Sequence, residues 1–235
     1  MIVESCCASL DEALSAEARG AGRIEICADL SVGGVTPPRE LIREVVSRLS
    51  IPVNVLIRPS APRRSQNLFE PAGAFGSDPL VIPGSDRASE FACSDFVCDE
   101  DSLQQMIDDI SYCKRAGAAG IVIGALTPEG AIDLPAMRRL VAAAQPFPVT
   151  FHRAFDVCTE DPFIALDKII SLGCARLLTS GHAPTAWEGR NLIRLLVRRA
   201  GGRIIIMPGR GVTPSNLAAL ATATQATEFH GTAIP

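Results

Sequence analysis

The sequence predicts a (β/α)8 barrel formed by one domain over residues 1–235. Eight short runs rich in Ile, Val, Leu or Phe are bounded by Gly or Pro, which is typical of buried parallel strands. Helical patterns separate these runs, and strands that alternate with helices indicate a parallel sheet. Eight strands in 235 residues favour a closed TIM barrel. An open doubly wound sheet is the alternative, since both folds use right-handed crossovers.

The predicted strands each have one face for helices and one for the barrel interior, because strand side chains alternate. In the second strand, Ile24 and Ile26 share one face. Arg23, Glu25 and Cys27 share the other. The eight predicted strands are Ile2–Cys7, Arg23–Cys27, Pro52–Ile57, Gly120–Gly124, Phe147–His152, Ala175–Thr179, Arg203–Met207 and Thr227–His230.

Capping residues indicate where the helices begin. Ser9 followed by Glu12 has the spacing of a capping box. Thr36 and Thr213 each precede a proline, so an N-cap residue is followed by proline at the first helical position. The later predicted helices are Asp99–Ala116, Leu134–Ala144, Pro162–Leu172, Pro184–Ala200 and Ser215–Ala223.

Two features depart from a regular barrel. Residues 60–90 contain several prolines with many Gly, Ser and Arg residues and no visible period, which predicts a long insertion after the third strand. Such an insertion is either a lid over the barrel or a segment without a role in the site. The chain stops at Pro235, directly after the eighth strand, so little or no C-terminal helix is expected.

Composition excludes several classes of partner. The net charge of −4 argues against nucleic acid or an anionic membrane as partner. No apolar run approaches the roughly 20 residues that span a bilayer. The N-terminus lacks the basic and apolar regions of a signal peptide, so a cytoplasmic location is expected. The 8 cysteines should then be thiols, and none forms a C-x-x-C pair.

Polar residues gather at the carboxyl ends of five predicted strands, on the face that lines the barrel. The carboxyl ends of barrel strands are where active sites occur, so these residues predict a common polar mouth. Structural pairing inside the barrel is the alternative, above all for Glu4. The residues are Glu4 and Cys6, Glu25 and Cys27, Asn54 and Arg58, Thr150 and His152, and Glu228 and His230.

A Glu-x-Cys unit occurs in each of the first two strands, as Glu4-Ser5-Cys6 and Glu25-Ile26-Cys27. The two units are 21 residues apart, so Cys6 and Cys27 should lie at equivalent points of the two strands. Neighbouring strands lie ~4.8 Å apart, and two metal–sulfur bonds of ~2.3 Å span a similar distance. Two thiolates without other ligands select Cu(I). The pair is therefore compatible with a Cu(I) site, although its geometry alone does not favour that site over the alternatives. Two packing thiols, or a disulfide, are the alternatives.

Two glycine loops have the pattern of an anion site. Ser180 and Gly181 follow the sixth strand, and Gly209 and Gly211 follow the seventh, where backbone N–H groups at a helix start can bind phosphate or carboxylate. Arg58 and Arg210 could assist them. The candidates for acid–base catalysis are Glu25, His152, Asp156, Glu228 and His230. Lys114 and Lys168, the only lysines, fall on helices, which leaves a Schiff-base aldolase without a strand-end lysine.

Seven short motifs, in order along nearly the whole chain, resemble the copper homeostasis protein CutC family. The resemblance implies a (β/α)8 barrel, a cytoplasmic protein, self-association and a role in copper handling. It also implies that Cys6 and Cys27 are Cu(I) ligands. The chain departs from the family pattern at Arg210, where a glycine is usual. The motifs are Arg23–Cys27, Gly33–Pro37, Ile57–Pro59, Phe151–Asp156, Leu178–Gly181, Ile206–Gly209 and Glu228–His230.

The sequence therefore leaves two hypotheses for the function open. The first is a cytosolic copper homeostasis protein that binds Cu(I) through two barrel-strand cysteines. The alternative is an uncharacterised barrel enzyme that acts by acid–base chemistry on a small anionic metabolite, which could be phosphorylated. No particular reaction is predicted.

Overall fold

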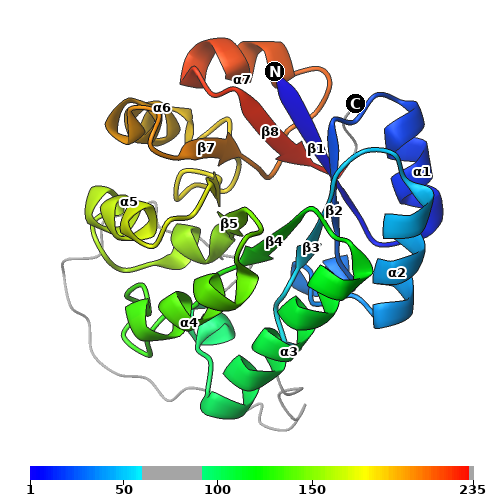
Figure 1. The fold of residues 1–235 in the computed structure, drawn as a ribbon. Coiled ribbons are helices and arrows are strands. Elements are labelled where there is room, and N and C mark those ends of the chain that lie inside the picture. Colours follow the sequence, from blue (N-terminus) through cyan, green and yellow to red (C-terminus); the bar gives the residue numbers. More distant parts are fainter. Residues whose placement is uncertain (60–91, 233–235) are drawn as a thin grey trace, which may run out of the picture.

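The computed structural model describes residues 1–59 and 92–232, and these form an eight-stranded parallel barrel with helices outside it (Figure 1). Backbone ladders join the strands in the order β7-β6-β5-β4-β3-β2-β1-β8. Strands β7 and β8 lie side by side and complete the ring. The predicted fold class is confirmed. The strands are β1 Ile2–Cys7, β2 Arg23–Ile26, β3 Val53–Leu56, β4 Gly120–Ile123, β5 Val149–Phe151, β6 Arg176–Thr179, β7 Ile205–Pro208 and β8 Glu228–Gly231.

The helices form the outer layer, as the amphipathic patterns require. Short 3-10 helices lie in three of the loops at the carboxyl ends of the strands. The α-helices are α1 Leu10–Ala18, α2 Arg39–Arg48, α3 Glu100–Ala116, α4 Leu134–Ala144, α5 Pro162–Ser171, α6 Arg190–Ala200 and α7 Leu217–Thr224. The 3-10 helices are η1 Leu30–Val32, η2 Cys93–Phe96 and η3 Arg153–Val157.

Three predicted helix starts are wrong, at Thr36, Pro184 and Thr213. Thr36 does not cap α2; its hydroxyl accepts from Arg58 N at 2.9 Å and donates to Arg58 O at 3.1 Å, which ties this loop to the end of β3. Thr213 does not cap α7, since its N–H donates to Asn216 Oδ1, and Asn216 is the N-cap. Helix α6 begins at Arg190 rather than at Pro184.

Aspartate and serine caps fix the start of several other helices. Asp99 accepts from Ser102 N at 2.8 Å, and Ser9 accepts from Glu12 N at 3.2 Å. We expect Asp99→Ala to lower the free energy of unfolding by about 1 kcal/mol, because the first turn of α3 loses a backbone acceptor. Urea denaturation measures this. Asp101→Ala, in the same turn but outside the cap, should change stability by less than about 0.5 kcal/mol; equal losses would contradict the capping role.

The core has an outer and an inner part, as strand alternation predicts. Ile24 and Ile26 belong to the large apolar layer between barrel and helices, where both side chains are fully buried. Inside the barrel, a small apolar cluster of Cys6, Cys27, Leu56 and Val122 lies among polar residues. The barrel interior is therefore chemically distinct from the core that stabilises its wall.

The predicted insertion at residues 60–90 lies entirely outside the described residues, which resume at residue 92. Beyond β8 the description extends only to residue 232, without a further helix in that stretch. In the described part of the chain, every helix is too short or too polar to cross a bilayer.

Candidate functional site

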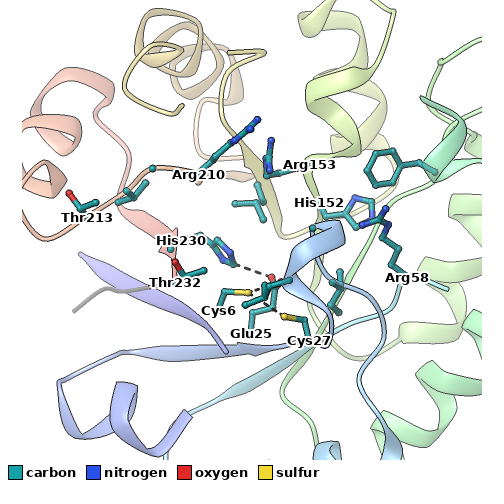
Figure 2. Close-up of a pocket in the computed structure, with 18 residues that line it drawn as sticks. Cys6, Glu25, Cys27, Arg58, His152, Arg153, Arg210, Thr213, His230 and Thr232 are labelled. Carbon is teal, nitrogen blue, oxygen red and sulfur yellow. Dashed lines mark hydrogen bonds and ion pairs between the residues drawn. The ribbon is translucent and has the colours of Figure 1, made fainter. Parts of the chain in front are cut away.

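A pocket of ≈ 360 Å³ opens at the carboxyl ends of the strands (Figure 2). Its floor, here called the pocket floor, consists of Cys6, Glu25, Cys27 and His230. Cys6 lies on β1, Glu25 on β2 with Cys27 directly after that strand, and His230 on β8. Apolar side chains, among them those of Leu30, Leu56, Phe96, Leu178 and Val212, form the wall. Three arginines also line the pocket and are here called the pocket arginines: Arg58, Arg153 and Arg210.

The thiols of Cys6 and Cys27 lie 3.5 Å apart, both buried. The equal heights assumed from the 21-residue repeat are not observed, because the β1–β2 register pairs Cys6 with Glu25. Cys27 lies two residues beyond Glu25, where its N–H donates to Cys7 O and its thiol lies 3.5 Å from the same oxygen. The two thiols nevertheless face each other across the strand pair.

A charged layer fills the barrel beneath the pocket floor. Arg23 forms ion pairs with Glu4 and, at 2.6 Å, with Glu228. Arg176 also reaches Glu228, at 2.7 Å, and Asn54 donates to Glu4 at 3.0 Å. The four charged residues come from β1, β2, β6 and β8. The sequence predicted Glu4 and Glu228 at the mouth, but both form ion pairs with arginines below it.

Glu25 and His230 form the polar side of the pocket floor. His230 Nδ1 lies 2.9 Å from Glu4 Oε1 and 3.8 Å from Glu25 Oε2. Burial raises the pKa of Glu25 to about 7, although the charge of His230 acts to lower it. Burial would also raise the pKa of Glu4, but the hydrogen bond and charge of His230, with Arg23, lower it to about 2. The two carboxyl groups therefore differ strongly in acidity although both contact one imidazole.

The thiol of Cys6 is a very weak acid. Its hydrogen bond with Cys27, burial and the charge of Glu25 hold its pKa well above the usual value. Burial also raises the pKa of other cysteines outside the pocket, to about 11 for Cys7 and Cys98 and about 12 for Cys113 and Cys174. These five thiols are accordingly protonated at neutral pH.

His152 lies on the pocket wall next to Arg58 (Figure 2). Its Nδ1 accepts from Ala154 N at 3.2 Å, and its Nε2 has no hydrogen-bond partner among the described residues. Burial, with the charge of Arg58, lowers the pKa of His152 to about 3. The ring is therefore neutral at neutral pH and a weak base, which suits hydrogen bonding better than general base catalysis.

Arg58 supports a loop as well as lining the pocket. Its Nη1 donates to Val32 O at 3.0 Å and Gly34 O at 2.9 Å, and its guanidinium lies 5.0 Å from the centroid of Phe96. This arginine therefore holds η1 and η2 against the end of β3. Any contact with an anion would be additional to that structural role.

The loop after β6 already holds an anion, which is the carboxylate of Asp156. Asp156 accepts from Ser180 N at 3.0 Å, from Thr179 Oγ1 at 2.5 Å and from His182 N at 3.3 Å. The N–H of Gly181 donates to Thr179 Oγ1 at 2.8 Å. The N–H groups of Ser180 and Gly181, which the sequence predicted to bind an external anion, thus donate to groups of the protein itself. Asp156 is a structural link between η3 and this loop rather than a group at the pocket floor.

The loop after β7 contributes directly to the pocket. Arg210 and Gly211 both have positive φ angles, of 74° and 68°, and both line it. Gly209 donates its N–H to Thr179 O, and a side chain there would collide with Leu178. Gly209 thus lies in close contact with Leu178, whereas Gly211 lies at the pocket surface.

Some residues of this region were missed from the sequence. Arg176 completes the charged layer, and Arg153 lines the pocket while its Nε donates to Asp156 at 3.0 Å. Arg176 shares the inward parity of Leu178 on β6, a signal that could have placed it inside the barrel. Arg153 directly follows His152 at the end of β5, but nothing in the local pattern distinguishes it from a solvent-exposed arginine.

Comparison with known proteins gives a consistent result over the whole chain. A family model described as the CutC family matches residues 1–70 and 92–235. Of the unmatched residues 71–91, all except residue 91 fall in the predicted insertion at residues 60–90. A CutC family protein of Parabacteroides distasonis is 42% identical over 233 residues, which is 99% of this chain and 82% of the relative. A copper homeostasis protein cutC homolog of Mus musculus is 39% identical, over 97% of this chain and 72% of the relative.

Solved structures agree. A crystal structure of CutC from Streptococcus agalactiae has 29% identity and a TM-score of 0.82, with all of both chains covered. Barrels with lower identity share the fold alone, such as the aldolase QR15, with 13% identity and a TM-score of 0.64 over 99% of this chain and 89% of that one.

Proposed function

Because this chain belongs to the CutC family of copper homeostasis proteins, we propose that it binds Cu(I) through the thiols of Cys6 and Cys27. The single observation that carries the proposal is the pair of buried thiols, 3.5 Å apart, at the bottom of the pocket. Soft thiolate ligands without harder donors favour Cu(I) over the other common metal ions.

The distance between the thiols suits one shared ion. Two metal–sulfur bonds of ~2.3 Å reach across at most ~4.6 Å, and the sulfur atoms are 3.5 Å apart. Cys6 and Cys27 need little movement to bind the same ion. Their neighbours Leu56 and Val122 are apolar, so the sulfur atoms have an apolar surface on one side.

Cu(I) must displace the thiol proton of Cys6 when it binds, since the hydrogen bond with Cys27 and burial keep Cys6 protonated in the metal-free protein. The ligands are held in place by the two neighbouring strands β1 and β2. Preorganised donors lose little conformational entropy on binding, which favours high affinity.

We expect the double variant Cys6→Ser, Cys27→Ser to lose Cu(I) binding, because hydroxyl groups are poor ligands for a soft cation. The measurement is competition for Cu(I) against a chromogenic chelator under anaerobic conditions. The matched control is Cys93→Ser, Cys98→Ser, which removes two half-buried thiols outside the pocket lining and should bind one equivalent of Cu(I) like the parent. If the Cys6, Cys27 variant competes as well as the parent, the proposal fails.

The acid–base enzyme receives less support from the geometry. Glu228 is held by two arginines, and Asp156 by the loop after β6. The low pKa of His152 makes it a poor base at neutral pH. A cytoplasmic location and self-association remain proposals that follow from the family resemblance.

A further inference from the structure

We propose that the pocket floor also contains a site for a divalent cation of borderline softness, such as Zn²⁺, formed by Cys6, Glu25 and His230. This site goes beyond the Cu(I) proposal, because it uses a carboxylate and an imidazole in place of Cys27. Sulfur, nitrogen and oxygen donors in one set match the ligands of zinc in proteins.

The three side chains already converge. One ligand atom from each of Cys6, Glu25 and His230 lies within 4.8 Å of the other two. Cys6 Sγ is 4.0 Å from Glu25 Oε1, and Glu25 Oε2 is 3.8 Å from His230 Nδ1. Donors arranged tetrahedrally around zinc are about 3.3–3.8 Å apart, as follows from bonds of about 2.0–2.3 Å. Because the ligand atoms lie within 4.8 Å of one another, closing the gaps needs shifts of about 1.5 Å or less, which rotamer adjustments supply.

Glu25 gives an independent indication of a ligand. Its side chain is buried, and Oε2 has no hydrogen-bond partner among the described residues. A buried carboxylate oxygen without a partner is costly, and such an atom calls for an ion or a donor. Figure 2 shows this carboxylate directed at Cys6 and His230, in the gap where the cation would lie.

His230 is oriented by a carboxylate, as metal-binding histidines usually are. Glu4 Oε1 lies 2.9 Å from Nδ1, so Glu4 engages this nitrogen and Nε2 is the ring atom left for the cation. Glu4 is itself held by Arg23 and Asn54. The charged layer thus fixes the imidazole at the pocket floor. Because the site has three protein ligands and opens into the pocket, a fourth coordination position is left for water or a small ligand, as in catalytic zinc sites.

The two metal sites share Cys6 and exclude each other. Cu(I) would use Cys6 with Cys27, whereas the divalent cation would use Cys6 with Glu25 and His230. On binding, the divalent cation replaces the thiol proton of Cys6, which leaves to solvent. This shared ligand allows the two sites to be separated by single substitutions, each of which removes one donor set and preserves the other.

The test uses the full-length protein and Co²⁺ as a spectroscopic probe for Zn²⁺, with Zn²⁺ competition to follow. We expect the parent to bind one Co²⁺ with thiolate-to-metal absorption, and Cys27→Ser to retain this signal while losing Cu(I). Glu25→Gln should weaken Co²⁺ binding at least tenfold and keep Cu(I) binding. Glu188→Gln, at an exposed position outside the pocket lining, is the control and should bind Co²⁺ like the parent.

Three outcomes would overturn the divalent site: no Co²⁺ binding by the parent, equal Co²⁺ affinity in parent and Glu25→Gln, or loss of the Co²⁺ signal in Cys27→Ser. If Glu25→Gln does not fold, as judged by circular dichroism, His230→Gln makes the same comparison. Failure of Cu(I) binding with Co²⁺ binding intact would instead contradict the proposed function alone, so the two failures are distinguishable.

Discussion

Replacing Arg23 by methionine is expected to lower the free energy of unfolding by about 3–5 kcal/mol, because it leaves buried carboxylates without their shared cation. Arg23 contacts both Glu4 and Glu228, and its own side chain is 5% exposed. Methionine has a similar volume, so the loss measures the charge rather than a cavity. Urea denaturation at neutral pH gives the value.

The control is Arg139→Met, which breaks an ion pair with Glu100 on the surface of the helix layer. Exposed ion pairs contribute about 0–1 kcal/mol, and Arg139 and Glu100 are both largely exposed. A loss for Arg23→Met as small as the loss for Arg139→Met would show that Glu4 and Glu228 find other partners. Such a result would remove the support that the charged layer gives to His230.

Asp156→Ala is expected to cost about 3 kcal/mol or more of stability, since several buried donors lose their acceptor together. The carboxylate binds Ser180 N, His182 N and the hydroxyl of Thr179, and it pairs with Arg153. The measurement is again urea denaturation. Proteolysis of the loop after β6 should become faster in the variant, because the link between η3 and that loop is lost.

Asp161→Ala is the comparison for Asp156, since the chemical change is identical. Asp161 caps α5 by accepting from Phe163 N and Ile164 N, and a lost cap costs about 1 kcal/mol. If Asp156→Ala is no more destabilising than Asp161→Ala, Asp156 is not a structural link, and the hypothesis of a catalytic carboxylate returns.

The sequence predicted the strands and most of the helices well because their signals are local. Short apolar runs between Gly and Pro located all eight strands to within a few residues. Alternation along β1 and β2 placed Cys6, Glu25 and Cys27 inside the barrel, where the structure has them. The helix start at Thr36 was wrong because a cap pattern does not show that the threonine binds the distant backbone of Arg58 instead. The start at Thr213 was wrong because the side chain of Asn216 accepts from its N–H, and the helix begins after Asn216.

The sequence by itself determined the barrel, its polar interior and the two cysteines that face each other. Only the tertiary structure decided which partner each polar side chain takes. Arg23 and Glu228 are 205 residues apart, yet they form an ion pair because β8 closes the ring beside β1. Register and strand tilt likewise brought His230 to Glu25 and Asp156 to Ser180. Such pairings depend on where strands meet in space, and no local pattern carries that information.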